Sequence, residues 1–146
     1  ATAIRGGITA PELADLELAY APPFGSAKDP VNMLGYIAEN IFTGLVKTSQ
    51  WNEIESFENQ GYELVDVRSP EEYSRGHIPG FVNIPVDELR TRSHEILGKR
   101  VLVTCQVGQR GHTASMILKG LGFEAVNLDG GYLLWSNSPA SLVSVH

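Results

Sequence analysis

One cysteine lies where a reactive thiolate is easiest to form. Cys105 is the single cysteine of the chain. It follows the apolar run 101–104, which predicts a buried strand, and it precedes residues 111–119, which predict a helix. A cysteine between a strand end and a helix start faces unpaired backbone N–H groups and the positive end of the helix dipole. This setting favours the thiolate, which is the nucleophilic form of the side chain.

The residues after Cys105 are suited to holding an anion on the sulfur. A helix dipole alone contributes only about 0.3–1 kcal/mol at an exposed site. We therefore expect loop N–H groups to supply the rest through charge-assisted hydrogen bonds of roughly 1.5–3 kcal/mol. Gly108 permits the positive φ that a curled loop needs, and Arg110 adds a permanent positive charge at the rim. The predicted anion-binding loop consists of Gln106, Val107, Gly108, Gln109, Arg110 and Gly111.

The alternative interpretation of Cys105 is a small buried core residue, which is common for free cysteines. The polar residues that directly follow Cys105 are poor core residues, and they favour the reactive interpretation. No cysteine–histidine cluster has metal-ligand spacing, so we expect no metal.

Four segments, in order along the chain, resemble the signatures of rhodanese-type sulfurtransferases. They are residues 64–73, 76–85, the loop 105–110 and residues 128–135. The resemblance implies an α/β rhodanese-like fold whose mostly parallel central sheet is flanked by helices on both faces. It also implies that Cys105 is the catalytic residue and carries a persulfide between a small sulfur donor and an external thiol acceptor. We expect the donor to be a persulfide or polysulfide, including coenzyme A persulfide.

Two other functions stay open at this point. Cysteine phosphatases also use a cysteine, an N–H cradle and an arginine, but five residues separate the cysteine from the arginine. Here only four residues separate Cys105 from Arg110, which leaves phosphatase activity a remote alternative. The second alternative is a non-catalytic docking or regulatory domain that keeps the loop without turnover.

The first part of the chain resembles a different protein. Residues 14–24 and 26–33 are similar to the end of the dimerisation domain of flavin-dependent coenzyme A-disulfide reductases and their NADH oxidase relatives. We therefore expect residues 1–46 to be a mainly helical remnant of that domain with a linker, and residues 47–146 to be the rhodanese-like domain. The chain starts at Ala1 in mid-pattern, which predicts a piece of a longer protein. The alternative for residues 1–46 is a linker with an amphipathic helix packed on the main domain.

This second resemblance implies partners and cofactors for the longer protein. It implies missing flavoprotein domains that use FAD, coenzyme A and NAD(P)H, and no cofactor within this segment. Tyr20 matches a tyrosine that reaches toward the coenzyme A site of the partner subunit. The resemblance therefore also implies that the longer protein can form a homodimer.

Helix and strand patterns alternate through residues 47–146. Ser49 is expected to cap a helix with the apolar face Trp51, Ile54 and Phe57, and Ser69 to start a helix through a capping box with Glu72. The other expected elements are strands at 63–67, 81–84, 101–104 and 125–128, and helices at 86–97, 111–119 and from residue 130. Such alternation indicates a parallel sheet, and ligands bind at the carboxyl ends of its strands.

Two charged residues end the strand at 63–67 near the expected site. Asp66 and Arg68 are candidates for the rim of the active site, although we expect Arg68 to pair with Glu71 or Glu72 and hold the turn. His77 is expected to be structural, and Trp135 to be a core residue.

Composition excludes several classes of partner. The net charge of −6 argues against nucleic acid and anionic membrane surfaces. No apolar stretch reaches the length of a membrane span, and no signal-peptide pattern is present. A lone cysteine fits a reducing compartment, which predicts a cytoplasmic location.

Overall fold

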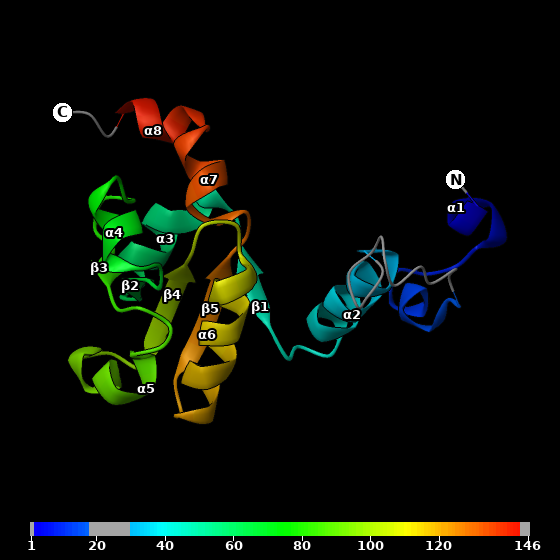
Figure 1. The fold of residues 1–146 in the computed structure, drawn as a ribbon, viewed down its shortest axis with the longest axis horizontal. Helices are drawn as coiled ribbons and strands as arrows, with labels where there is room; N and C mark the ends of the chain where they lie inside the picture. The colour runs from blue at the N-terminus through cyan, green and yellow to red at the C-terminus, as the bar shows by residue number, and fades with distance from the viewer. Residues whose placement is uncertain (1, 18–29, 144–146) are drawn as a thin grey trace. The chain divides into compact units, whose positions relative to one another are not determined.

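The structure is a computed structural model that describes residues 2–17 and 30–143 (Figure 1). The chain divides into two compact units, and the division falls between Leu45 and Val46. The prediction for Tyr20 lies outside the described residues.

The described part of the first unit is helical. It contains α1 (Thr2–Gly6), the 3-10 helix η1 (Pro11–Asp15) and α2 (Pro30–Phe42). The Thr9 N–H and hydroxyl both donate to the Glu12 carboxylate at 2.7 Å, just before η1. The Asn32 side-chain amide donates to the carbonyls of Leu13 and Leu16 at 3.0 and 2.9 Å. These bonds join α2 to η1.

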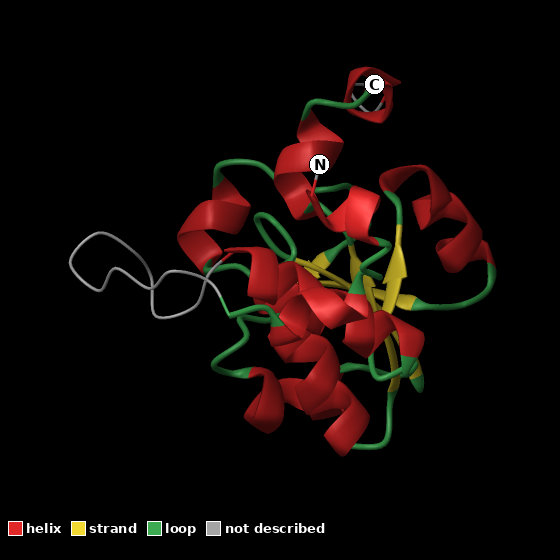
Figure 2. Cartoon of the chain, turned by 90° about the vertical axis from the view of Figure 1, so that its right-hand side faces the viewer, coloured by secondary structure: helices red, strands yellow, loops and turns green. Residues whose placement is uncertain are grey.

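The second unit is built on a five-stranded sheet in the order β1-β5-β4-β2-β3. The strands are drawn in yellow in Figure 2, and every pair is parallel. Their bounds are β1 Lys47–Ser49, β2 Glu63–Asp66, β3 Val82–Asn83, β4 Arg100–Thr104 and β5 Glu124–Leu128. The central strand β4 is buried from Val101 to Thr104 because both faces of a parallel sheet are covered.

Helices cover both faces of this sheet. They are α3 (Ile54–Asn59) after the 3-10 helix η2 (Trp51–Glu53), α4 (Pro70–Ser74), α5 (Leu89–Arg92) with η3 (Ser93–Glu95), α6 (Gln109–Gly120), α7 (Gly131–Ser136) and α8 (Pro139–Val143). Alternate side chains of β4 point to opposite faces. Val103 therefore packs with Leu118 of α6 in one core cluster, and Leu102 packs with Trp135 of α7 in the other. The predicted α/β fold and the core position of Trp135 are confirmed.

Two local predictions are wrong. Ser49 does not cap a helix: it ends β1, which the sequence pattern did not predict, and Gln50 forms the capping box with Glu53 instead. The expected helix at 86–97 is reduced to α5 and η3. The side chains of Thr91 and Ser93 bond to backbone carbonyls three residues earlier, which competes with continued helix formation.

None of the helices within residues 2–17 and 30–143 has the length and apolar character needed to cross a bilayer.

Candidate active site

The sulfur of Cys105 lies at the carboxyl end of β4, directly before α6. Its Sγ accepts the backbone N–H of Gly108 at 3.1 Å. Gly108 is the N-cap of α6 and has a φ of 104°, a left-handed conformation that favours glycine. The loop therefore curls back so that a main-chain amide faces the sulfur, which is the arrangement that the sequence predicted.

Apolar side chains pack against Cys105 on its core side. The residue is only 1% exposed and shares a core cluster with Val67 and Ala114. A hydrogen bond to sulfur is electrostatically stronger in such a low-dielectric environment than in water. The side chain thus combines a hydrocarbon backing with an amide donor from the loop, so burial alone does not make it a structural cysteine.

The carbonyl groups of the loop are held by the elements next to it. The N–H groups of Tyr132 and Leu133, in the first turn of α7, donate to the carbonyls of Cys105 and Gln106 at 2.8 and 3.0 Å. In a trans peptide the C=O and the following N–H point in opposite directions. Fixing these carbonyls toward α7 therefore turns the next N–H groups of the loop to the other side.

A glycine makes this approach of α7 possible. Gly131 has a φ of 56°, and a Cβ at this position would lie 2.3 Å from the carbonyl oxygen of Cys105. Any other residue would push α7 and the loop apart. The sequence analysis assigned no role to Gly131 at the site.

Arg110 is paired rather than free at the rim. Its guanidinium donates two hydrogen bonds of 2.6 Å to the two carboxylate oxygens of Glu72. These bonds are the main reason that the pKa of Glu72 is lowered to about 2, and they also raise the pKa of Arg110. Glu72 accepts the Ser69 N–H as well, and Ser69 accepts the Glu72 N–H, which confirms the predicted capping box.

The prediction that Arg68 pairs with Glu71 or Glu72 is wrong. Arg68 is 1% exposed and forms its ion pair with the fully buried Asp66 at 2.7 Å. Asp66 also accepts the backbone N–H of Arg68, so the two residues close a short turn at the end of β2. A buried guanidinium needs a carboxylate that is equally desolvated, and the exposed side of α4 does not provide one.

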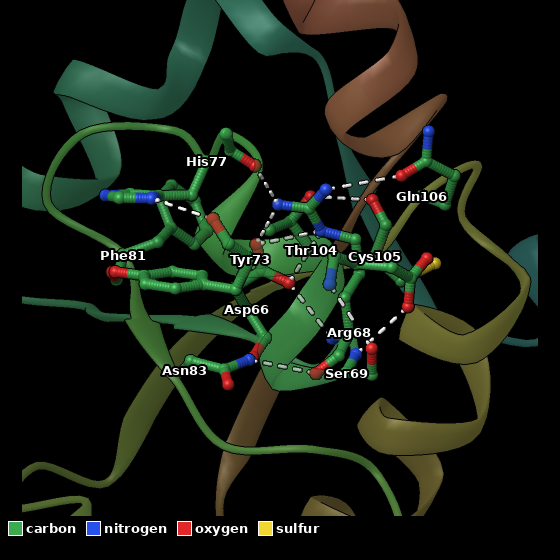
Figure 3. Close-up of polar contacts among 12 residues, drawn as sticks. Asp66, Arg68, Ser69, Tyr73, His77, Phe81, Asn83, Thr104, Cys105 and Gln106 are labelled. Carbon is green, nitrogen blue, oxygen red and sulfur yellow. Dashed lines mark hydrogen bonds and ion pairs between the residues drawn. The ribbon is translucent and has the colours of Figure 1, made fainter.

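The rim interpretation of Asp66 and Arg68 is corrected too, because both side chains are buried. The Arg68 guanidinium donates to the Gly76 carbonyl at 2.8 Å and to the Gln106 side chain at 3.3 Å, and Figure 3 shows the second of these contacts. The guanidinium carbon lies 4.1 Å from the centre of the Tyr132 ring. Arg68 therefore supports the loop from within the protein.

The remaining loop residues and His77 have clear places. Val107 and Gln109 are exposed, whereas Gly111 is buried beside Asn127. The His77 ring stacks on Tyr73 at 3.9 Å and contacts its carbonyl oxygen at 3.2 Å (Figure 3). This is the structural role predicted for His77.

Comparison with known proteins agrees with this geometry. The family model "Rhodanese-like domain" matches residues 50–138. The chain belongs to the rhodanese-like domain family. Its rhodanese-like domain is 34% identical over 85 residues to the thiosulfate sulfurtransferase GlpE of Pseudomonas syringae, a match that covers 57% of this chain and 80% of that protein.

Two solved structures resemble both units of the chain. The reduced CoADR-RHD of Bacillus anthracis is 48% identical with a TM-score of 0.85, and the match covers 92% of this chain and 24% of that one. The NAD-dependent persulfide reductase of A. fulgidus is 38% identical with a TM-score of 0.77, and this match also covers 92% of this chain and 24% of that one. Because residues 47–146 are only about two thirds of the chain, a match over 92% also includes most of the first unit.

The chain spans only part of several relatives. It covers 48% of the HTH-type transcriptional regulator Rv0324 of Mycobacterium tuberculosis, to which it is 36% identical over 126 residues. It covers about a quarter of the two solved structures. This rhodanese-like domain is thus related to sulfurtransferases and to the domains of a persulfide reductase.

Proposed function

We propose that this rhodanese-like domain transfers sulfur through a persulfide on Cys105. The observation that carries the proposal is the Gly108 N–H directed at Sγ, 3.1 Å away, at the start of α6. A main-chain donor in this place stabilises negative charge on the sulfur without a neighbouring acid or base. The relationship to a thiosulfate sulfurtransferase supports the same chemistry.

The reaction consists of two displacements at sulfur. The Cys105 thiolate attacks the outer sulfur of a donor persulfide, a bond forms from Sγ to that sulfur, and the bond to the donor's inner sulfur breaks. The inner sulfur leaves with the electron pair as a thiolate. An acceptor thiolate then attacks the outer sulfur of the Cys105 persulfide and releases the Cys105 thiolate. The sulfur atom is passed on at constant oxidation state, so no oxidant or reductant is needed.

The charges around the loop favour a persulfide or polysulfide as the donor. Both nearby arginines are already paired, Arg110 with Glu72 and Arg68 with Asp66. Anion binding then rests on main-chain N–H groups, which suit a singly charged sulfur better than a dianion such as thiosulfate. The acceptor is a thiol outside this sequence, which holds no second cysteine; it belongs to a separate molecule or to another part of a longer protein.

We further propose that the chain is part of a larger pyridine nucleotide-disulfide oxidoreductase. The match of both units to CoADR-RHD and to an NAD-dependent persulfide reductase supports this context. In that protein, coenzyme A persulfide is the donor, and FAD, NAD(P)H and coenzyme A serve the missing flavoprotein domains. Tyr20 is then a contact to the coenzyme A site of a partner subunit.

Intact mass spectrometry tests the sulfur transfer. The protein is incubated with an organic persulfide or with polysulfide, freed of the excess and weighed. We expect a gain of one sulfur atom in the unchanged protein and none in Cys105→Ser. The absence of an adduct with persulfide, polysulfide and thiosulfate alike would leave the non-catalytic docking domain as the better explanation.

A further inference from the structure

A buried amide side chain lies beneath the loop, and the sequence analysis gave it no role. Asn127 is the fourth residue of β5 and is 6% exposed. Its side-chain N–H donates to the carbonyl oxygen of Gly108 at 3.1 Å. Its Oδ1 has no hydrogen-bond partner among the described residues. Burying an amide with an unsatisfied oxygen is unfavourable, so the bond to Gly108 has to offset a local loss of stability.

Gly108 is held on both sides by this arrangement. Its N–H donates to Cys105 Sγ, and its carbonyl accepts from Asn127 and from the His112 N–H at 2.9 Å. The His112 bond is the first intrahelical bond of α6, and the bond from Asn127 is an additional one from outside the helix. A glycine at a φ of 104° has wide conformational freedom. A second fixed bond to its carbonyl therefore restricts the direction of its N–H.

The close fit at Gly111 belongs to the same contact. A Cβ at position 111 would lie 2.1 Å from Oδ1 of Asn127. The first turn of α6 thus rests directly on the Asn127 side chain, and only glycine allows this separation. Gly111 and Asn127 together set the distance between the first turn of α6 and β5.

We propose that Asn127 is a positioning residue, which holds the Gly108 peptide so that its N–H faces the sulfur of Cys105. The catalytic role of Asn127 rests on the proposed function, whereas its effect on the geometry of the free Cys105 thiol does not. Without the Asn127 bond, the Gly108 peptide rotates more freely and the sulfur loses part of its stabilised charge. Both alkylation of Cys105 and formation of its persulfide then become slower.

The test compares Asn127→Ala with Ser138→Ala. Ser138 is a suitable control because it is also buried and donates one hydrogen bond to a backbone carbonyl, that of Trp135 at 2.6 Å, away from the loop. Alkylation of Cys105 by iodoacetamide at pH 7 is measured without any sulfur donor. We expect Asn127→Ala to react about fivefold to tenfold more slowly, the factor for one hydrogen bond. Ser138→Ala should react at the unchanged rate, although both variants lose thermal stability.

Turnover of the same variants distinguishes a positioning role from a general loss of stability, because kcat and KM are measured separately. With a persulfide donor, Asn127→Ala should lower kcat and leave KM unchanged, because the bond acts on the reacting sulfur. Equal alkylation rates in Asn127→Ala and Ser138→Ala would overturn the inference. If the unchanged protein accepts no sulfur from any donor, the proposed function fails, while the alkylation rates still decide the role of Asn127.

Asn127→Asp keeps the shape of the side chain and provides a second test if Asn127→Ala does not fold. Only a protonated carboxyl group donates to the Gly108 carbonyl. The alkylation rate of Asn127→Asp relative to the unchanged protein should therefore fall as the pH is raised from about 5 to about 9. A ratio that stays constant over this range would contradict the positioning role.

Discussion

The ion pair between Glu72 and Arg110 ties the active-site loop to α4, and its strength is open to direct measurement. The pKa of Glu72 is lowered from 4.5 to about 2, mainly by the two hydrogen bonds from Arg110. A shift of this size corresponds to about 3–4 kcal/mol at most. Solvent screening reduces it to about 1–2 kcal/mol, because the two side chains are 29% and 38% exposed.

Glu72→Gln removes the charge and keeps the helix cap, since glutamine also serves at this position of a capping box. We expect a loss of about 1–2 kcal/mol of unfolding free energy at pH 7. A double-mutant cycle with Arg110→Met isolates the coupling between the two side chains. Urea denaturation followed by tryptophan fluorescence reports on the second unit alone, because Trp51 and Trp135 are the two tryptophans of the chain.

The stabilisation that Glu72 provides depends on pH. The pKa of Glu72 is lower in the folded protein than the ordinary 4.5, so the stabilisation is fully present above this pH. It disappears as the pH falls toward 2, and roughly half is lost by pH 3. The difference between the unchanged protein and Glu72→Gln should shrink accordingly. A coupling energy near zero at pH 7, or one that is equal at pH 7 and pH 3, would refute the reasoning.

Three further substitutions test residues that support the site, and two of them are compared with a second variant. Gly131→Ala should slow alkylation of Cys105 and destabilise the protein by about 1–3 kcal/mol, whereas Gly122→Ala, with a φ of 86° and no atom within 4 Å of its Cβ, should affect stability alone. Arg68→Met should cost about 3–5 kcal/mol in urea denaturation because it leaves Asp66 buried and unpaired; adding Asp66→Asn should recover part of the loss, and no recovery would contradict the pairing. Ser69→Ala should lower the unfolding free energy by about 1 kcal/mol through loss of the cap, and an unchanged value would show that the cap is not formed in solution.

Elements with strong local signals were predictable from the sequence. The apolar run 101–104 became β4, and the Ser69–Glu72 capping box started α4. Strand β1 was not predictable in this way. It has three residues, lies at the edge of the sheet and pairs only with β5, and its first two side chains are exposed. An edge strand of this kind lacks the apolar pattern that marks a buried one.

Contacts of the site between residues close in sequence were predictable, but contacts between residues far apart in sequence were not. The order strand, Cys105, glycine-containing loop and helix placed the Gly108 amide near the sulfur. The choice of ion-pair partner depends on tertiary structure: Arg110, not Arg68, reaches Glu72, because the Arg68 side chain turns inward to Asp66. Asn127 comes from a strand 22 positions after Cys105, and only the sheet brings it beneath the loop.

The proposed function requires that Cys105 carries a transferable sulfur atom held by the loop. The most direct measurement is a single turnover with isotopically labelled sulfur, in which the persulfide form is isolated and then mixed with a small thiol. We expect the protein to lose the mass of one labelled sulfur atom and the thiol to gain it. A label that never enters at Cys105, or that enters and is not released to a thiol, would show that Cys105 does not transfer sulfur.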